Sequence, residues 1–211
     1  MGAITRAFAN NILTSGKFNA AQLDGTLPAL DGSSLTGLAQ DQELISNTTI
    51  SPAGYIDLTT AFTDTTYTNF IIFGVGVNMV TDDNDMRFNF INNSGTLVAD
   101  TNYYWAGVGQ RDTGQAVDFG ASGTSYGRIM DNNSNTGQSI NWTMTIFKPF
   151  ISGHYTSFTV SAGGRRSGGG ANTVHVGGYA NTTDQIKGIR FLMNTGNISA
   201  GNLLLYGLRD S

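Results

Sequence analysis

Hydrophobic and polar positions alternate along most of the chain beyond about residue 45. Met86–Ile91 and Ile140–Phe147 alternate cleanly, which predicts strands with one buried face. Phe70–Val77 is apolar at nearly every position, which is typical of a strand packed between two layers. The remaining expected strands are Tyr55–Leu58, Tyr103–Val108, Ser125–Met130, Tyr155–Ser161, Thr173–Val176, Ile186–Met193 and Leu203–Tyr206.

Turn-forming residues separate these runs. Asn92–Gly95 is expected to close a hairpin after Met86–Ile91, and similar clusters of Asn, Gly, Asp and Ser follow the other runs. Many short strands with polar turns and no helical stretch between them predict an antiparallel β-sandwich or jelly roll. We therefore expect an all-β jelly-roll domain over residues 46–211, preceded by an N-terminal arm over residues 1–45.

The arm has a different pattern. Ile4, Phe8 and Ile12 recur at i, i+4 and i+8, which predicts a helix of about two to three turns. A helix this short is marginal alone in water, so its apolar stripe needs a surface to pack on. That surface is either the protein's own domain or another protein.

Composition narrows the function classes. Charged residues make up only 12% of the chain and the net charge is -4, so there is no basic footprint for nucleic acid. The absence of cysteine excludes disulfides and thiolate metal sites. No apolar run approaches the ~18 to 20 residues that span a membrane. Neither a nucleic acid nor a membrane is therefore an expected partner.

The sequence offers little catalytic or metal chemistry. Asp82–Asp85 is the main acidic cluster, but it lacks the spacing of an EF-hand loop, so a solvated turn is favoured over a calcium site. His154 and His175 have no metal-ligand motif around them. Glu43 is the one glutamate, and no carboxylate pair for glycan hydrolysis stands out. We expect no enzymatic activity, no catalytic residue, no metal and no cofactor.

Two segments carry candidate contact residues. The glycine-rich run Gly163–Gly170 contains Arg165 and Arg166 and lacks the spacing of a phosphate-binding loop. It is expected to be an exposed loop, whose arginines have the alternative role of binding carboxylates of a neighbouring subunit. In Tyr103-Tyr104-Trp105, alternation places Tyr103 and Trp105 on one face, which is either buried in the core or available as a platform for sugar rings.

The C-terminal run carries a family resemblance. The segment ANTTDQIKGIRFLMNTGNISAGNLLLYGL, residues 180–208, resembles the closing strands of a jelly-roll module of structural proteins from marine bacteriophages. Tyr55–Leu58 and Tyr67–Ile72 are similar to the opening strands of that module, so the resemblance covers roughly residues 50 to 208. The chain departs from the family at its end, where Leu208 and three further residues follow Tyr206-Gly207 in place of a final isoleucine.

The resemblance implies a virion component. Within that class, the short arm favours a homotrimeric capsid decoration (cement) protein on the outer surface of the phage particle, bound to the major capsid protein or another virion protein. The alternative is a short tail-fibre or spike tip that binds host surface glycan. A polysaccharide depolymerase is a third and weaker alternative.

The arm also contains the run AAQLDGTLPALDGSSLTGLA, residues 20–39. Its glycines and Pro28 exclude a continuous helix, which leaves two Asp-Gly turns between short extended pieces. Similar LPALDGSxLTG runs occur in phage fibre and virion proteins. Such a thin ribbon cannot bury its own leucines, so we expect them to pack against sister chains or a virion surface. The expected anchor residues are Ile4, Phe8, Ile12, Leu23, Leu27, Leu30, Leu35 and Leu38.

Overall fold

The computed structural model describes residues 13–14, 17–18, 41–98, 101–133 and 140–209. The chain divides into two units, Met1–Ala39 and Gln40–Ser211. In the first unit, β1 (Leu13–Thr14) pairs antiparallel with β2 (Lys17–Phe18). The expected helix around Ile4–Ile12 and the leucines of residues 20–39 lie outside the described residues, so the anchor assignments stay predictions.

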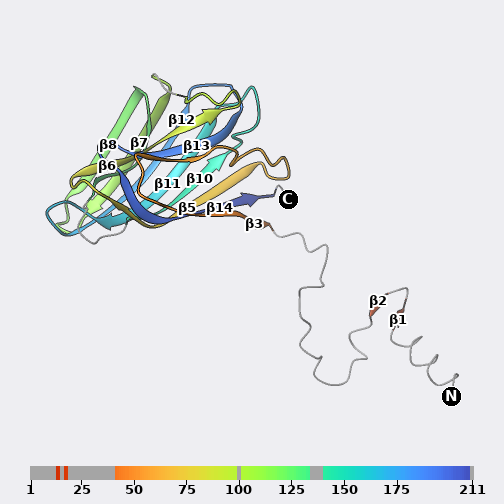
Figure 1. Cartoon of the computed structure of the whole chain (residues 1–211), viewed down its shortest axis with the longest axis horizontal. Helices are drawn as coiled ribbons and strands as arrows, with labels where there is room; N and C mark the ends of the chain where they lie inside the picture. Colours follow the sequence, from red (N-terminus) through yellow and green to blue (C-terminus); the bar gives the residue numbers. More distant parts are fainter. Residues whose placement is uncertain (1–12, 15–16, 19–40, 99–100, 134–139, 210–211) are drawn as a thin grey trace, which may run out of the picture. The chain divides into compact units, whose positions relative to one another are not determined.

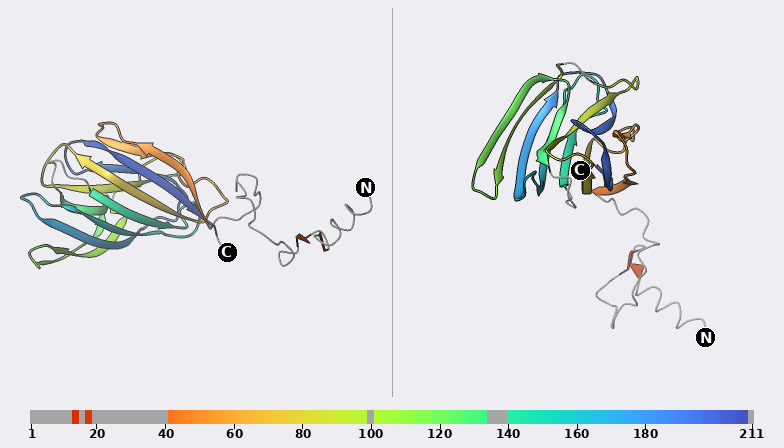
Figure 2. Two further views of the ribbon diagram at one scale, coloured as in Figure 1. Left: turned by 90° about the horizontal axis from the view of Figure 1, so that it is seen from below. Right: turned by 60° about the vertical axis from the view of Figure 1, so that its left-hand side comes forward.

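The second unit is built from two antiparallel sheets that face each other (Figures 1 and 2). The larger sheet has eight strands, in the order β3 (Gln42–Thr49), β14 (Ile198–Leu208), β5 (Asn69–Met79), β10 (Ile140–Phe147), β11 (Thr156–Arg165), β12 (Ala171–Ala180), β7 (Tyr103–Arg111) and β8 (Ala116–Thr124). The smaller sheet has four strands, in the order β4 (Tyr55–Leu58), β13 (Ile186–Met193), β6 (Asn84–Asn92) and β9 (Gly127–Asn133).

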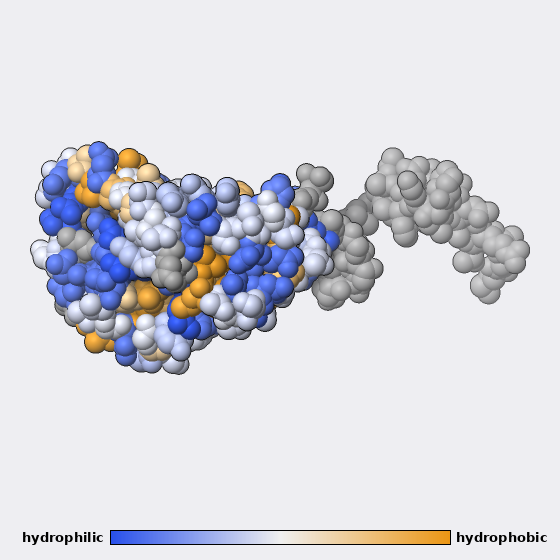
Figure 3. Space-filling model, turned by 90° about the horizontal axis from the view of Figure 1, so that it is seen from above, coloured by the Kyte–Doolittle hydropathy of each residue, from blue (hydrophilic) through white to orange (hydrophobic). Residues whose placement is uncertain are grey.

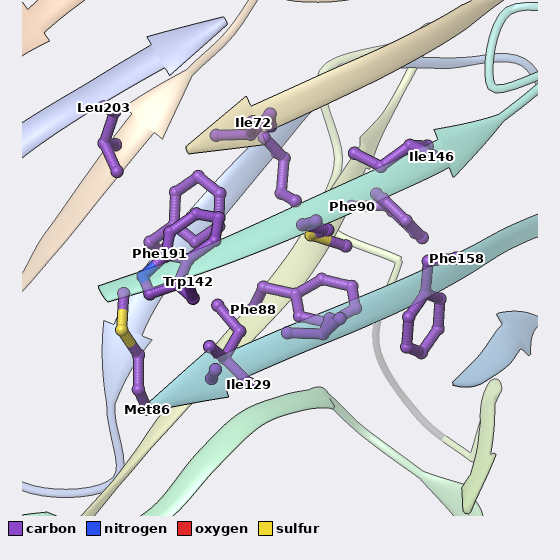
Figure 4. Packing of buried hydrophobic residues seen from close by; sticks show 14 of the residues in the cluster. Ile72, Met86, Phe88, Phe90, Ile129, Trp142, Ile146, Phe158, Phe191 and Leu203 are labelled. Carbon is purple, nitrogen blue, oxygen red and sulfur yellow. The ribbon is translucent and has the colours of Figure 1, made fainter. Parts of the chain in front are cut away.

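The core lies between the two sheets and is rich in aromatic rings (Figure 4). Phe88 of the smaller sheet meets Phe158 of the larger sheet edge to face, with ring centroids 4.9 Å apart. Trp142 of the larger sheet packs against Phe191 of the smaller one at 5.0 Å. Edge-to-face aromatic pairs add about 0.5 to 1.5 kcal/mol each beyond area burial, so the Phe88–Phe158 contact helps to hold the two sheets together.

Tyr103 brings a polar group into this core without leaving it unpaired. Its hydroxyl accepts a hydrogen bond from the backbone N–H of Phe90 at 2.6 Å and donates one to the carbonyl of Val98 at 2.9 Å. Burial raises the pKa of the Tyr103 phenol well above its ordinary value, so the hydroxyl keeps its proton and its donor role.

The four-stranded sheet is too narrow to cover the whole inner face of the eight-stranded sheet. The end strands β3 and β8 contain no fully buried residue, whereas the strands between them alternate between buried and more exposed positions. The smaller sheet therefore covers the middle of the larger one, and the outer face of the larger sheet has no second layer among the described residues.

These features confirm the expected all-β, antiparallel, sandwich-like class. Tyr55–Leu58, Ile140–Phe147 and Ile186–Met193 have the predicted bounds, and each of the other expected runs overlaps an observed strand. Asn92–Gly95 forms the expected turn, in which the Gly95 N–H donates to the carbonyl of Asn92 at 2.9 Å.

Three details differ from the expectations. The division after residue 45 falls inside β3, which belongs to the second unit. β5 does not lie between two layers, because the residues of its outer face stay partly exposed, up to 45% at Val75. The glycine-rich run Gly163–Gly170 is not wholly a loop, because β11 continues to Arg165 and only the turn follows. Within the described ranges, no helix is long and apolar enough to cross a membrane.

Candidate binding surfaces on the eight-stranded sheet

The outer face of the eight-stranded sheet displays one side chain from every second residue of each strand. Cross-strand pairing sorts these side chains into rows. One row runs from Leu44 through Tyr206, Ile71, Thr145, Thr159, Gly177 and Ala106 to Gly120. The next runs from Asn47 through Leu204, Phe73, Thr143, Ser161, His175 and Val108 to Asp118. Both rows change character between β5 and β10.

The part of this face over β3, β14 and β5 is mainly apolar, apart from Asn47, Thr49 and Asn202, and we call its apolar side chains the apolar half. Its residues are Leu44, Ile71, Phe73, Val75, Leu204 and Tyr206. Phe73 and Tyr206 meet edge to face with ring centroids 5.6 Å apart. Leu44 and Val75 remain 49% and 45% exposed. Figure 3 shows one face of the molecule, on which hydrophobic residues reach the surface in places among hydrophilic ones.

The part over β10, β11, β12 and β7 is hollowed and mostly polar, and we call it the polar half. A groove of about 510 Å³ runs beside it from β5 to β12. A second groove of about 430 Å³ shares Thr143, Ser161 and His175 with the first, so the two are continuous. No Lys, Arg, Asp or Glu lines either groove among the described residues.

One edge of the polar half carries three tyrosines, which we call the tyrosine cluster. The rings of Tyr104 on β7 and Tyr179 on β12 are stacked, with centroids 5.2 Å apart and planes 6° from parallel. Tyr155, in the turn before β11, approaches Tyr179 at 5.7 Å. Tyr155 is 55% exposed and Tyr179 is 36% exposed, so flat aromatic surface faces solvent.

The structure corrects the contact role considered for Tyr103 and Trp105. Both belong to the core, with 0% and 6% exposure. The indole N–H of Trp105 is engaged inside the fold by Thr124 Oγ1 at 3.1 Å and the Tyr126 carbonyl at 3.2 Å. Alternation correctly placed these two residues on one face, and that face is the buried one. Tyr104, on the other face, is the residue that reaches the surface.

The two arginines of the glycine-rich run have different surroundings. Arg165 is exposed at the end of β11. Arg166 Nε lies 3.8 Å from Asp112 Oδ1, and both side chains are partly exposed. The pairing of Arg166 within its own chain leaves Arg165 as the better placed of the two to contact a neighbouring subunit.

The acidic cluster is occupied by protein groups. Asp85 Oδ2 forms ion pairs with Arg87, at 3.1 Å, and with Arg128. Asp82 accepts a hydrogen bond from the Ser167 hydroxyl at 2.9 Å. In the described part of the chain, no group of three His, Asp or Glu side chains is placed to hold a metal ion. His154 is exposed in a turn, and His175 lines the grooves of the polar half.

Sequence reasoning missed the two outer-face surfaces as units. The alternation in Thr173–Val176 predicted a strand. It could not predict that the outward side chain of His175 lies beside Thr143 and Ser161 and lines a groove with them. Those residues lie on β10 and β11, so strand order creates the groove. The tyrosine cluster likewise joins residues from three separate parts of the chain.

No protein-family model matches the chain, and no curated protein sequence matches it. Among solved structures, the chain is similar to the CBM2 module of the evolved Dit of Lactobacillus casei BL23 phage J-1. The two share 12% sequence identity, the match covers 78% of this chain and 69% of the other, and the TM-score is 0.23. A likeness of this size carries no functional argument, so function has to be argued from the surfaces themselves.

Proposed function

We propose that this protein is a non-enzymatic structural component of a bacteriophage virion, and that it is a homotrimeric capsid decoration (cement) protein. The jelly-roll domain would face outward, and the segment before β3 would anchor it to the major capsid protein or another virion protein. Support comes from the C-terminal resemblance to marine phage structural proteins, from the all-β sandwich and from a surface poor in charge.

The apolar half of the outer face is the observation that carries the self-association in this proposal. Monomeric soluble proteins seldom expose contiguous apolar patches larger than a few hundred Å² unless the patch binds something. Here apolar side chains from three adjacent strands lie side by side, and Leu44 and Val75 are about half exposed. The occupants that we propose are the apolar halves of two further copies of the chain, which would converge with the first around the threefold axis of the trimer.

The charge distribution around β3 favours a like partner. The carboxylate of Glu43 accepts a hydrogen bond from the Tyr67 hydroxyl at 2.6 Å and pairs with Arg209 at 3.3 Å. The charge of Glu43 is therefore balanced within the chain. Glu43 also points to the opposite side of β3 from its neighbour Leu44, so it does not lie in the apolar half. Around a threefold axis three copies of one patch approach each other, and an uncharged patch does so without like-charge repulsion.

A short tail-fibre or spike tip is the alternative within the same class, because it would form a trimer through the same apolar half. The number of copies per particle separates the two. Hundreds of copies on a stained gel of purified particles support decoration, whereas a few dozen or fewer support a tail appendage.

The trimer is tested with matched aspartate substitutions. Leu44→Asp combined with Val75→Asp places two charges in the apolar half at exposed positions, so folding should survive. We expect light scattering to give the mass of three chains for the wild type and of one chain for the double variant. Val108→Asp is the control, because Val108 is 58% exposed on the polar half. A wild-type protein that is monomeric at tens of micromolar would refute the trimer.

The anchor is tested separately by deleting residues 1–40. We expect the remaining β domain to stay soluble and to stop joining the virion. If the truncated protein still decorates particles at the wild-type copy number, the anchor is not in this segment.

A further inference from the structure

The polar half of the outer face has features that trimer assembly does not use. The tyrosine cluster lies at one end, and the groove around His175 follows along the same strand. Tyr179 and His175 point to the same side of β12, four residues apart, which corresponds to about 13 Å at ~3.3 Å per residue. Gly177 stands between them, and no heavy atom approaches the position of a side chain there within 4 Å. The tyrosine cluster and the groove lined by His175 and Gly177 therefore form one open trough.

The walls of this trough offer unused hydrogen-bonding groups. Thr143, Thr159 and Ser161 present hydroxyls from β10 and β11. Among the described residues, no protein group forms a hydrogen bond with the side chains of Thr143, Ser161 or His175. Hydroxyls both donate and accept, and an imidazole adds one of each, so the walls match a ligand that carries many hydroxyl groups.

The charge of the trough narrows the class of ligand. A phosphate, a sulfate or a nucleic acid strand would need Lys or Arg beside it, and none lines the grooves among the described residues. A purely apolar ligand would leave the threonine and serine hydroxyls unpaired. Flat aromatic faces at one end and neutral hydroxyls along the rest suit a chain of uncharged sugar rings. The aromatic rings would pack on the apolar faces of the sugar rings, and the polar walls would form hydrogen bonds with the sugar hydroxyls.

We propose that this trough is a carbohydrate-binding site for a neutral oligosaccharide or polysaccharide chain. The tyrosine cluster, with Tyr179 as the ring that contacts both of the others, supplies the aromatic surface on which one sugar ring packs. His175, Ser161 and Thr143 bind hydroxyls further along the chain. The length of the trough accommodates more than one ring. The residues proposed to bind sugar all lie on the polar half, so they are separate from the proposed trimer contact, although Phe73 and Val75 of the apolar half border the first groove.

Binding is tested on the full-length protein by titration calorimetry. The probes are maltohexaose, cellohexaose, chitohexaose and a β-linked galactose oligomer, with heparin and oligo(dT) as charged probes. We expect at least one neutral oligosaccharide to bind and both charged probes to fail. No binding of any neutral probe at millimolar concentration would overturn the proposal, as would stronger binding of oligo(dT) or heparin.

Three variants then locate the site. Tyr179→Ala should weaken binding of the positive probe at least tenfold, whereas Tyr179→Phe, which keeps the ring, should retain most of the affinity. His175→Ala should weaken it by a smaller factor. Tyr55→Ala is the matched control, because Tyr55 is 51% exposed but lies on β4 in the smaller sheet. Binding unchanged in both Tyr179→Ala and His175→Ala would show that the site is elsewhere.

The melting temperature of each variant confirms that it is folded, and light scattering reports its mass. Loss of sugar binding in Tyr179→Ala with an unchanged mass separates this proposal from the trimer. Failure of the trimer test leaves the sugar titration fully interpretable, because the trough lies within one chain.

Discussion

The apolar half and the polar half belong to one sheet and cover the same continuous core, yet their outer surfaces differ. Ile71 and Phe73 on β5 stand directly beside Thr145 and Thr143 on β10, so the change occurs across a single strand pair. The inner residues of both strands are equally buried, as Ile72 and Met144 show with 0% exposure each. The core therefore sets the fold, and the outer positions are free to serve two different contacts.

The largest expected effect concerns the inner face, which both halves need. A methyl group at Gly74 would stand 2.1 Å from the ring of Trp142. Because overpacking in a core costs about 1 to 3 kcal/mol, we expect Gly74→Ala to lower the free energy of unfolding by that amount in urea titrations. Gly177→Ala, in open space, should change it by less than about 0.5 kcal/mol. Equal losses in both variants would mean that inner and outer positions are not distinct.

The next effect concerns the apolar half itself. Phe73→Ala removes the edge-to-face contact with Tyr206, which predicts a loss of about 1 to 2 kcal/mol from the lost aromatic pair and area. It should also remove the dependence of the melting temperature on protein concentration, because that dependence comes from self-association. Thr143→Ala, at the paired position on β10, should leave the concentration dependence intact. A wild-type melting temperature independent of concentration would contradict the comparison.

A smaller effect is expected in the tyrosine cluster. Tyr104→Ala removes the ring stacked on Tyr179, which predicts a loss of about 0.5 to 1 kcal/mol because the stack is partly solvated. Chemical unfolding of the wild type, Tyr104→Ala and Tyr155→Ala measures the free energy of unfolding that each substitution removes. Tyr155 is more exposed and only tilted against Tyr179, so its removal should cost less. The reverse order would mean that Tyr155, rather than Tyr104, makes the stronger contact with Tyr179.

The smallest effect lies at the turn after β11. Arg166 and Asp112 are partly exposed and 3.8 Å apart, a kind of pair that contributes about 0 to 0.5 kcal/mol. A double-mutant cycle with Arg166→Ala and Asp112→Ala should give a coupling energy in that range. Arg165→Ala is the control and should change stability by no more. A coupling above about 1 kcal/mol would make this turn a structural element of the polar half.

The sequence predicts the strands well wherever the inner residues are large and apolar. Ile140–Phe147 alternates bulky residues with polar ones, and its bounds are those observed. β8 escaped prediction because Ala116–Thr124 consists mainly of small residues and glycine, so its alternation is weak. β3 escaped because it lies at the sheet edge and buries none of its side chains fully, which leaves Leu44 and Ile45 adjacent rather than alternating.

The surfaces were less accessible to sequence reasoning. Alternation showed that Tyr103 and Trp105 share a face, but it cannot show which face meets the core. Strand order decides that, because β7 pairs with β12 and thereby brings Tyr104 onto Tyr179. The apolar half is hidden for the same reason, since β14 and β5 are far apart along the chain. The hydrophobicity of both faces of Phe70–Val77 was the signal of the apolar half in the sequence. It predicted a strand between two layers, whereas the structure leaves the outer face of this strand uncovered.

The position of β14 has a consequence for how the protein is made. Residues 198–208 lie between β3 and β5, which are formed by residues 42–49 and 69–79. During translation, β3 and β5 leave the ribosome before their shared partner β14, which is synthesised more than a hundred residues after β5. Such distant pairing slows folding. A nascent chain interrupted before residue 198 lacks the strand between β3 and β5, so an unfinished polypeptide cannot complete the eight-stranded sheet.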